Sequence, residues 1–189
     1  MALVGLSAAL LMVLFGPADC AEAAGPWRAV IVDAETGQPV EGVVVLAYWM
    51  KYTGSPGGWG ATYYAADETV TGSDGRFEIP ARITFTWVPF FTQIRGPEFK
   101  IFKPGYGRWD IRKPEQPVDG QRKLPAELLA QDGAVIALPP LKTREARLEF
   151  YRHFGRTPPI DIPEDRTRRF YQADDLERTY LGFPTRQTR

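Results

Sequence analysis

The residue types that most often perform catalysis are scarce in this chain. His153 is the one histidine among 189 residues, so a zinc site built on two or three histidines and a carboxylate cannot form. A serine–histidine–aspartate triad would have to use His153 alone, and no G-x-S-x-G motif is present. We expect His153 to lie on a helix surface or to pack within the C-terminal tail. We therefore predict no catalytic residues, no metal and no cofactor.

Acidic side chains gather at two places in the sequence. They are Asp67, Glu68 and Asp74 near an expected hairpin, and Asp161, Glu164 and Asp165 near the C-terminus. Two carboxylates that meet in space can hydrolyse a glycosidic bond, so a small carboxylate-dependent hydrolase is one alternative function. Calcium also binds carboxylates, but this spacing matches no calcium-loop motif. We favour the simpler interpretation that these acids are solvated strand ends.

Large aromatic residues occur in the glycine-rich stretch at residues 51–66. The candidate ligand-binding side chains there are Trp59, Tyr63 and Tyr64. Rings exposed on a loop can stack on sugars or bind a protein partner, so a carbohydrate-binding module is a second alternative function. The same rings can instead fold back over a sheet and complete the core, and we favour that interpretation.

The overall charge balance gives no support for some classes of partner. Lysine plus arginine equals aspartate plus glutamate, 23 of each, which gives no electrostatic case for binding nucleic acid or anionic lipid. The 44% of hydrophobic and 24% of charged residues are ordinary for a globular protein with a sizeable core. Seventeen prolines and 18 glycines favour a turn-rich β protein.

The N-terminus has the features of an export signal. Residues 3–15 form an apolar run that is too short to span a bilayer comfortably, and small residues follow it. We expect a signal peptide at residues 1–24, cleavage near Ala23 or Ala24, and no integral membrane span in the mature chain. The protein would then be periplasmic or secreted. Cys20 offers an alternative, a lipoprotein acylated at this cysteine, although Asp19 directly before it fits a lipobox poorly.

Alternating and β-branched residues predict a β domain over residues 25–141. Residues 40–49 are apolar on both faces, which predicts a strand buried on both sides. Residues 51–66 indicate a long loop or a loose hairpin. The other expected strands include residues 83–91, whose far end Pro89 makes an edge, residues 99–109 and residues 134–138. About seven strands at this spacing are typical of a sandwich.

Residues 142–189 are expected to form a helical or irregular tail that packs on the sandwich. A helical period begins at Thr143, which has the right side chain for an N-cap. A second short helix is expected at residues 173–181, with its acids in the first turn. The aromatic residues through which the tail would pack are Phe150, Tyr151, Phe170, Tyr171 and Phe183.

Two turns contain residues that can hydrogen-bond their own backbone. In the first, Asp33 and Thr36 can bond the turn, and Gly37 can adopt the positive φ that closes it. Asp74 and Gly75 form a second turn dipeptide of the same kind. Turn chemistry therefore accounts for these polar residues without catalysis.

In order along the chain, these motifs resemble the carboxypeptidase regulatory-like domain family. The matching positions are Asp33, Thr36, Gly37 and Pro39, then Thr71, Asp74, Gly75 and Phe77, then Pro104, Gly105 and Tyr106. The resemblance covers about residues 27–140. It implies an all-β fold, a seven-stranded antiparallel transthyretin-like Greek-key β-sandwich, here with a short α-helical C-terminal tail. We expect a non-enzymatic structural or binding module of the bacterial cell envelope, whose partner is another envelope protein or a glycan.

Overall fold

The computed structural model describes residues 23–87, 91–112, 125–130, 132–153 and 162–186, and the structural statements below concern these residues. The strands are β1 (Ala23–Ala24), β2 (Trp27–Asp33), β3 (Val44–Ser55), β4 (Gly58–Val70), β5 (Arg76–Ile79), β6 (Arg82–Ile83), β7 (Thr92–Phe102), β8 (Asp110–Arg112) and β9 (Val135–Leu138). The helices are α2 (Pro125–Leu129), α3 (Arg144–His153), the 3-10 helix η1 (Glu164–Arg166) and α4 (Arg168–Leu181).

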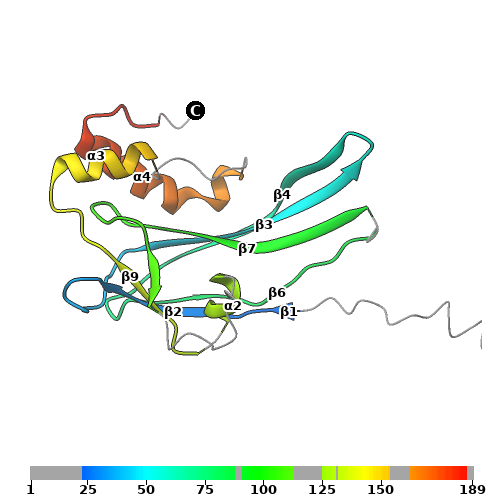
Figure 1. The fold of residues 1–189 in the computed structure, drawn as a ribbon, viewed down its shortest axis with the longest axis horizontal. Helices are drawn as coiled ribbons and strands as arrows, with labels where there is room; N and C mark the ends of the chain where they lie inside the picture. Colours follow the sequence, from blue (N-terminus) through cyan, green and yellow to red (C-terminus); the bar gives the residue numbers. More distant parts are fainter. Residues whose placement is uncertain (1–22, 88–90, 113–124, 131, 154–161, 187–189) are drawn as a thin grey trace, which may run out of the picture.

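Two sheets lie face to face, and helices α3 and α4 cover the outer face of one of them (Figure 1). The uncovered sheet is four-stranded, in the order β5-β2-β9-β8. The covered sheet is three-stranded and antiparallel, in the order β4-β3-β7. A short two-stranded sheet joins β1 to β6.

The predicted all-antiparallel, seven-stranded Greek-key sandwich is wrong. Strand β9 runs parallel to β2, with Ile136 beside Ile31, and the helices form a third layer, so the fold is mixed α/β. The connection from β2 to β9 passes through the other sheet and α2, and a crossover of this length lets the chain return in the same direction. The apolar sequence of β9, VIAL, suits a strand with little exposure.

The main core lies between the two sheets. Trp27 of β2 and Trp49 of β3 meet edge to face with their ring centroids 5.6 Å apart. Phe77 and Ile79 of β5 point into the same core, as their alternation with exposed neighbours predicts. Leu129 of α2 is fully buried against this core.

Strand β3 is buried on both faces over residues 44–49, which confirms that part of the strand predicted at residues 40–49, whereas residues 40–43 form a turn before it. Its side chains alternate between the inter-sheet core, which holds Val45 and Trp49, and a second core under the helices, which holds Leu46. Phe170 and Ala173 of α4 fill that second core. The helical layer therefore completes the burial of β3.

The first turn has the predicted hydrogen bonds. One Asp33 carboxylate oxygen accepts the backbone N–H groups of Glu35 and Thr36, each at 2.9 Å, and Gly37 has a φ of 71°. The Thr36 hydrogen bond is the main cause that lowers the pKa of Asp33. The second turn uses Asp74 in the same way, accepting the Arg76 N–H at 3.0 Å. In both turns the aspartate therefore stabilises the local backbone conformation.

The helices match the sequence in part. Thr143 accepts the Ala146 N–H at 3.2 Å and caps α3 as expected. Helix α4 begins at Arg168, earlier than predicted, and its first turn contains no acid, contrary to expectation. The segment predicted as a strand at residues 83–91 is also largely wrong, because β6 ends at Ile83 and residues 84–87 are not strand.

Candidate functional site

The β3–β4 hairpin continues beyond the core as a paired arm, made of residues 50–63 together with residues 92–95 of β7. Strand pairing runs without interruption from Met50 and Tyr63 to Ser55 and Gly58, where a two-residue turn closes the hairpin. Of the two alternatives expected for residues 51–66, a long loop or a loose hairpin, the structure has a hairpin, and its pairing is regular. Buried pairs nearer the core fix its register, and the pairing then propagates outward.

Strand β4 has a β-bulge at Tyr64, directly after the other candidate tyrosine, Tyr63. Trp49 pairs with Ala65 and Met50 pairs with Tyr63, so Tyr64 is the extra residue of β4. Tyr64 packs against the inter-sheet core and Tyr63 packs against the core under the helices. The two rings therefore lie on opposite faces of the sheet. Bulges bend and twist a strand pair, and the arm curves away from the four-stranded sheet (Figure 1).

Most of the large apolar side chains that the structure leaves exposed lie around this arm. We call the following set the aromatic end: Trp59, Ile83, Phe85, Trp87 and Phe91. Trp87 is the most exposed, at 88%, and Phe85 contacts it edge to face with centroids 5.0 Å apart. A cluster of exposed apolar side chains of this kind usually marks an interaction surface.

Backbone contacts bring the parts of the aromatic end together. Trp59 pairs with Gly54 across the hairpin, and the Gly54 N–H donates to the Phe91 carbonyl at 2.8 Å. The Phe85 N–H donates to the Tyr64 hydroxyl at 3.4 Å. Three chain segments that are separate in sequence therefore meet at one end of the molecule.

The aromatic end surrounds the arm. Strand alternation places Trp59 on the same face as Tyr63, toward the helical layer. Phe85 is bonded to Tyr64, which faces the other sheet. Apolar rings consequently lie on both sides of the arm, which makes a wedge and not a flat platform.

The charges of the arm are all positive. Residues 50–65 and 80–97 contain no aspartate or glutamate. Lys51 and Arg95 are exposed on the arm, and among the described residues neither is in an ion pair. The Arg95 guanidinium lies 4.9 Å from the centroid of the Tyr52 ring and donates to Gln93. Arg82, in contrast, is paired with Asp67 at 2.6 Å.

The carboxylates that the sequence singled out have structural partners. Asp67 binds Arg82, and Glu68 accepts the N–H groups of Arg169 at 2.9 Å and Phe170 at 2.6 Å. Glu68 therefore supplies the negative charge that the first turn of α4 lacks. Asp67 and Glu68 line a pocket of about 610 Å³, which also contains the arginines at positions 166, 168 and 169.

Among the remaining predicted acids that the structure describes, only Asp165 lines the same pocket. Asp74 belongs to its turn, and Glu164 and Asp165 lie exposed on η1, where Asp165 contacts Arg166 at 3.4 Å. Asp161 lies outside the described residues. Within the described ranges no three histidine, cysteine, aspartate or glutamate side chains are grouped to hold a metal ion.

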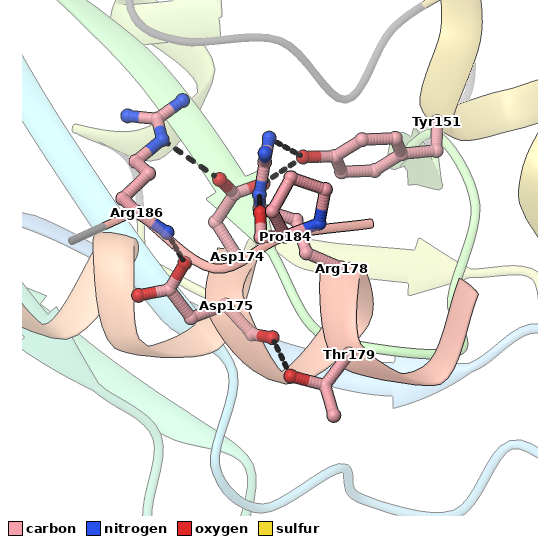
Figure 2. Close-up of polar contacts among 7 residues, drawn as sticks. All are labelled: Tyr151, Asp174, Asp175, Arg178, Thr179, Pro184 and Arg186. Carbon is pink, nitrogen blue, oxygen red and sulfur yellow. Dashed lines mark hydrogen bonds and ion pairs between the residues drawn. The ribbon is translucent and has the colours of Figure 1, made fainter. Parts of the chain in front are cut away.

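A buried polar network, which sequence reasoning missed, ties the C-terminal residues to α3 and α4 (Figure 2). Asp174 is only 1% exposed and accepts the Tyr151 hydroxyl at 2.8 Å. Its other carboxylate oxygen lies 3.3 Å from Arg186 Nε. Burial raises the pKa of both Asp174 and Tyr151. Arg178 adds a hydrogen bond to the Pro184 carbonyl at 2.7 Å.

A second buried ion pair joins the helices to the late P-G-Y turn. Glu177 is 4% exposed and binds Arg147 through both carboxylate oxygens. The Gly105 N–H donates to the same carboxylate at 3.0 Å. The Arg147 guanidinium also stacks over the Tyr180 ring, 3.5 Å from its centroid. Every polar group in this cluster therefore has a partner inside the protein.

Two predicted residues lie apart from both regions. His153 is exposed at the last position of α3, with Nδ1 2.8 Å from the Glu149 carbonyl oxygen. This position agrees with the expected helix surface. Cys20 lies outside the described residues.

The comparisons with known proteins do not identify the chain. No family model, no curated protein and no solved structure matches it. The resemblance of its turn motifs to the carboxypeptidase regulatory-like family therefore stays a prediction. In the part of the chain that the structure describes, no helix is long and apolar enough to cross a membrane.

Proposed function

We propose that this protein is a non-enzymatic binding module of the bacterial cell envelope and that the aromatic end is its binding surface. One observation carries the proposal. Large apolar side chains from three segments are held exposed at one end of the molecule, on the paired arm, at the end of β6 and on the non-strand residues next to them. Exposed apolar surface favours aggregation, and a binding partner that covers this surface would remove it from water.

The positions of the acids support the non-enzymatic part of the proposal. General acid–base catalysis needs a carboxylate that can reach a substrate proton. Asp67 is engaged by Arg82, Glu68 caps α4, and Asp74 closes a turn. A broad hydrolase screen tests this point. Turnover that disappears in the Asp67→Asn variant would contradict the proposal.

The binding part is tested by sedimentation with isolated envelope fragments that contain both membrane and peptidoglycan. We expect the chain to sediment with the fragments and the triple variant Trp59→Ala/Trp87→Ala/Phe91→Ala to stay in solution. Leu176→Ala is the matched control, because Leu176 is 66% exposed but lies on α4. Equal sedimentation of the triple variant and the unchanged chain would overturn the proposal.

A carbohydrate ligand is a second candidate, and one contact favours it. A Cβ built on Gly54 would lie 3.6 Å from the Trp59 ring, so the ring packs over this glycine while more than half of the residue stays exposed. An exposed indole can stack on a sugar. Binding to purified peptidoglycan that is lost in Trp59→Ala but kept in Trp87→Ala would favour this candidate.

A further inference from the structure

We propose that the aromatic end docks on an anionic lipid surface, with its rings inserted at the level of the headgroups. This inference rests on the proposed function and names the ligand of the same surface. Tryptophan is enriched at membrane–water interfaces, where one part of an amphipathic ring is apolar and another is polar. Trp59 and Trp87 are both largely exposed here, beside Phe85 and Phe91.

The shape of the aromatic end favours a membrane over a flat ligand. A sugar or a protein groove is contacted by one face, but the rings here lie on both sides of the arm. The Trp59 side faces the helical layer, and the Phe85 side faces the other sheet. A wedge with apolar side chains on two sides is suited to insertion between lipid headgroups, which close around it.

The backbone of the arm suits the headgroup level of a bilayer more than its hydrocarbon. A backbone N–H or carbonyl without a hydrogen bond is costly away from water. At the tip, Ser55 pairs with Gly58, and the Ser55 hydroxyl donates to the Gly58 carbonyl at 2.9 Å. The Gly54 N–H is bonded to the Phe91 carbonyl. These hydrogen bonds satisfy the backbone groups that face the inside of the hairpin, while the outer edges of β4 and β7 are left for the polar headgroups and water.

Charge indicates the sign of the lipid. Basic residues near a bilayer are attracted to anionic headgroups, and acidic residues are repelled. Lys51 and Arg95 lie on the arm, and no acid occurs in residues 50–65 or 80–97. Their long side chains can place the charge at the headgroups while their stems lie along apolar surface. The whole chain has equal numbers of acidic and basic residues, so its net charge does not reveal that the arm itself is basic.

The N-terminal chain enters the fold at the same end. Strand β1 pairs with β6, and Ala23 lies opposite Ile83 of the aromatic end. The apolar residues 3–15 and Cys20 directly precede β1 in the sequence. A membrane attachment of this N-terminus would therefore hold the aromatic end close to the bilayer, where the two contacts act together.

Flotation with vesicles of pure phosphatidylcholine, or with added phosphatidylglycerol, tests the proposal on the full chain. All variants keep the same N-terminus, so its apolar run contributes equally to each. We expect binding that rises with the phosphatidylglycerol content. The Trp59→Ala/Trp87→Ala/Phe91→Ala and Lys51→Glu/Arg95→Glu variants should each bind at least about tenfold more weakly, since both apolar insertion and charge are needed. Leu176→Ala should bind like the unchanged chain.

Failure of this inference is separable from failure of the proposed function. Sedimentation with envelope fragments but not with vesicles would leave the binding module standing and point to a glycan or protein ligand. Equal flotation of the triple variant and the unchanged chain would overturn the lipid proposal and assign the binding to the N-terminal run.

A fluorescence measurement locates the inserted residues. Brominated lipids quench tryptophans that enter the bilayer, whereas Trp27 and Trp49 are buried in the core and the partly buried Trp109 packs against it. We expect quenching in the unchanged chain and its loss in Trp59→Phe/Trp87→Phe, which keeps aromatic rings and hence flotation. Quenching that persists in this variant would contradict insertion at these positions.

Discussion

The two ends of strand β3 lie in opposite environments. Toward the core, Leu46 and Trp49 are covered by the helices on one face and by the second sheet on the other. Beyond the bulge after Trp49, the same strand alternates between exposed and partly buried residues. There it pairs with the part of β4 that contains Trp59 of the aromatic end. At the helical end the buried carboxylates of Asp174 and Glu177 are paired with arginines. At the arm, in contrast, large apolar rings are exposed and are not packed into the core.

This difference indicates which residues hold the fold and which are available for binding. Interactions at the covered end are internal, so changes there should appear as changes in the free energy of unfolding. Side chains at the aromatic end contribute little burial, so changes there should appear in binding. The predictions below test this division, beginning with the largest expected effect.

Trp49→Ala should destabilise the protein most. Trp49 is 1% exposed, meets Trp27 edge to face, and has the Arg82 guanidinium 5.0 Å from its ring centroid. Truncating a buried tryptophan typically costs about 3–5 kcal/mol. Urea unfolding followed by circular dichroism measures the loss. A change below about 1 kcal/mol would mean that the junction between core and arm is not packed as described.

Glu177→Ala should cost somewhat less. It leaves Arg147 without its carboxylate and the Gly105 N–H without its acceptor. Breaking a fully buried ion pair costs about 3–5 kcal/mol, and since Arg147 retains some exposure we expect about 2–3 kcal/mol. Glu177→Gln is the control, because it keeps an acceptor for Gly105 and should recover part of the stability in the same urea titration.

Glu68→Ala should have an intermediate effect. The variant removes the acceptor of the Arg169 and Phe170 N–H groups, and loss of an N-cap typically costs about 1 kcal/mol. Hydrogen exchange should increase at the first turn of α4 more than at α3. Uniform loss of protection over both helices would contradict a local capping role.

Asp174→Asn should change how stability depends on pH. Burial raises the pKa of Asp174 in the folded protein above its ordinary value of 3.8. Below pH 3.8 the carboxyl is protonated in the folded and the unfolded protein, and its contribution to the free energy of unfolding is fully present. It is lost as pH rises through the raised pKa, because the buried group must then ionise. Thermal unfolding at a series of pH values should show that the variant lacks this loss. Asp33→Asn is the opposite case, because the lowered pKa of Asp33 makes its contribution disappear as pH falls.

The smallest change in stability is expected at the aromatic end. Trp59→Ala and Trp87→Ala should each alter the free energy of unfolding by no more than about 0.5 kcal/mol, as is usual for exposed positions. A loss comparable to that of Trp49→Ala would show that these rings are core residues and would remove the distinction between the two ends.

Local chemistry was predictable from the sequence, and pairing between distant strands was not. Asp33, Asp74 and Thr143 bond to backbone within a few residues, so their roles follow from residue type. The parallel position of β9 depends on where the chain returns after more than 100 residues, and its apolar run does not distinguish it from the equally apolar, antiparallel start of β3.

The candidate site was predictable only in part. Trp59 was identified because it lies among glycines, but those glycines also suggested a loop, while the register set in the core extends the hairpin through them. Phe85 and Trp87 were assigned to a strand because aromatic and β-branched residues favour strands. Propensity cannot distinguish a buried strand from an exposed apolar segment. The bulge at Tyr64 depends on cross-strand pairing and has no local signature.

The Glu68 cap has a consequence for the order of folding. The capping carboxylate and the amide it binds on Phe170 are 102 residues apart, and no acid in the first turn of α4 can substitute. Closing so long a loop is slow, so contacts of this separation tend to form late. We expect the β4-β3-β7 sheet, whose strands are near one another in the sequence, to assemble before the first turn of α4 is fixed. Glu68→Ala should then accelerate unfolding while leaving the refolding rate nearly unchanged.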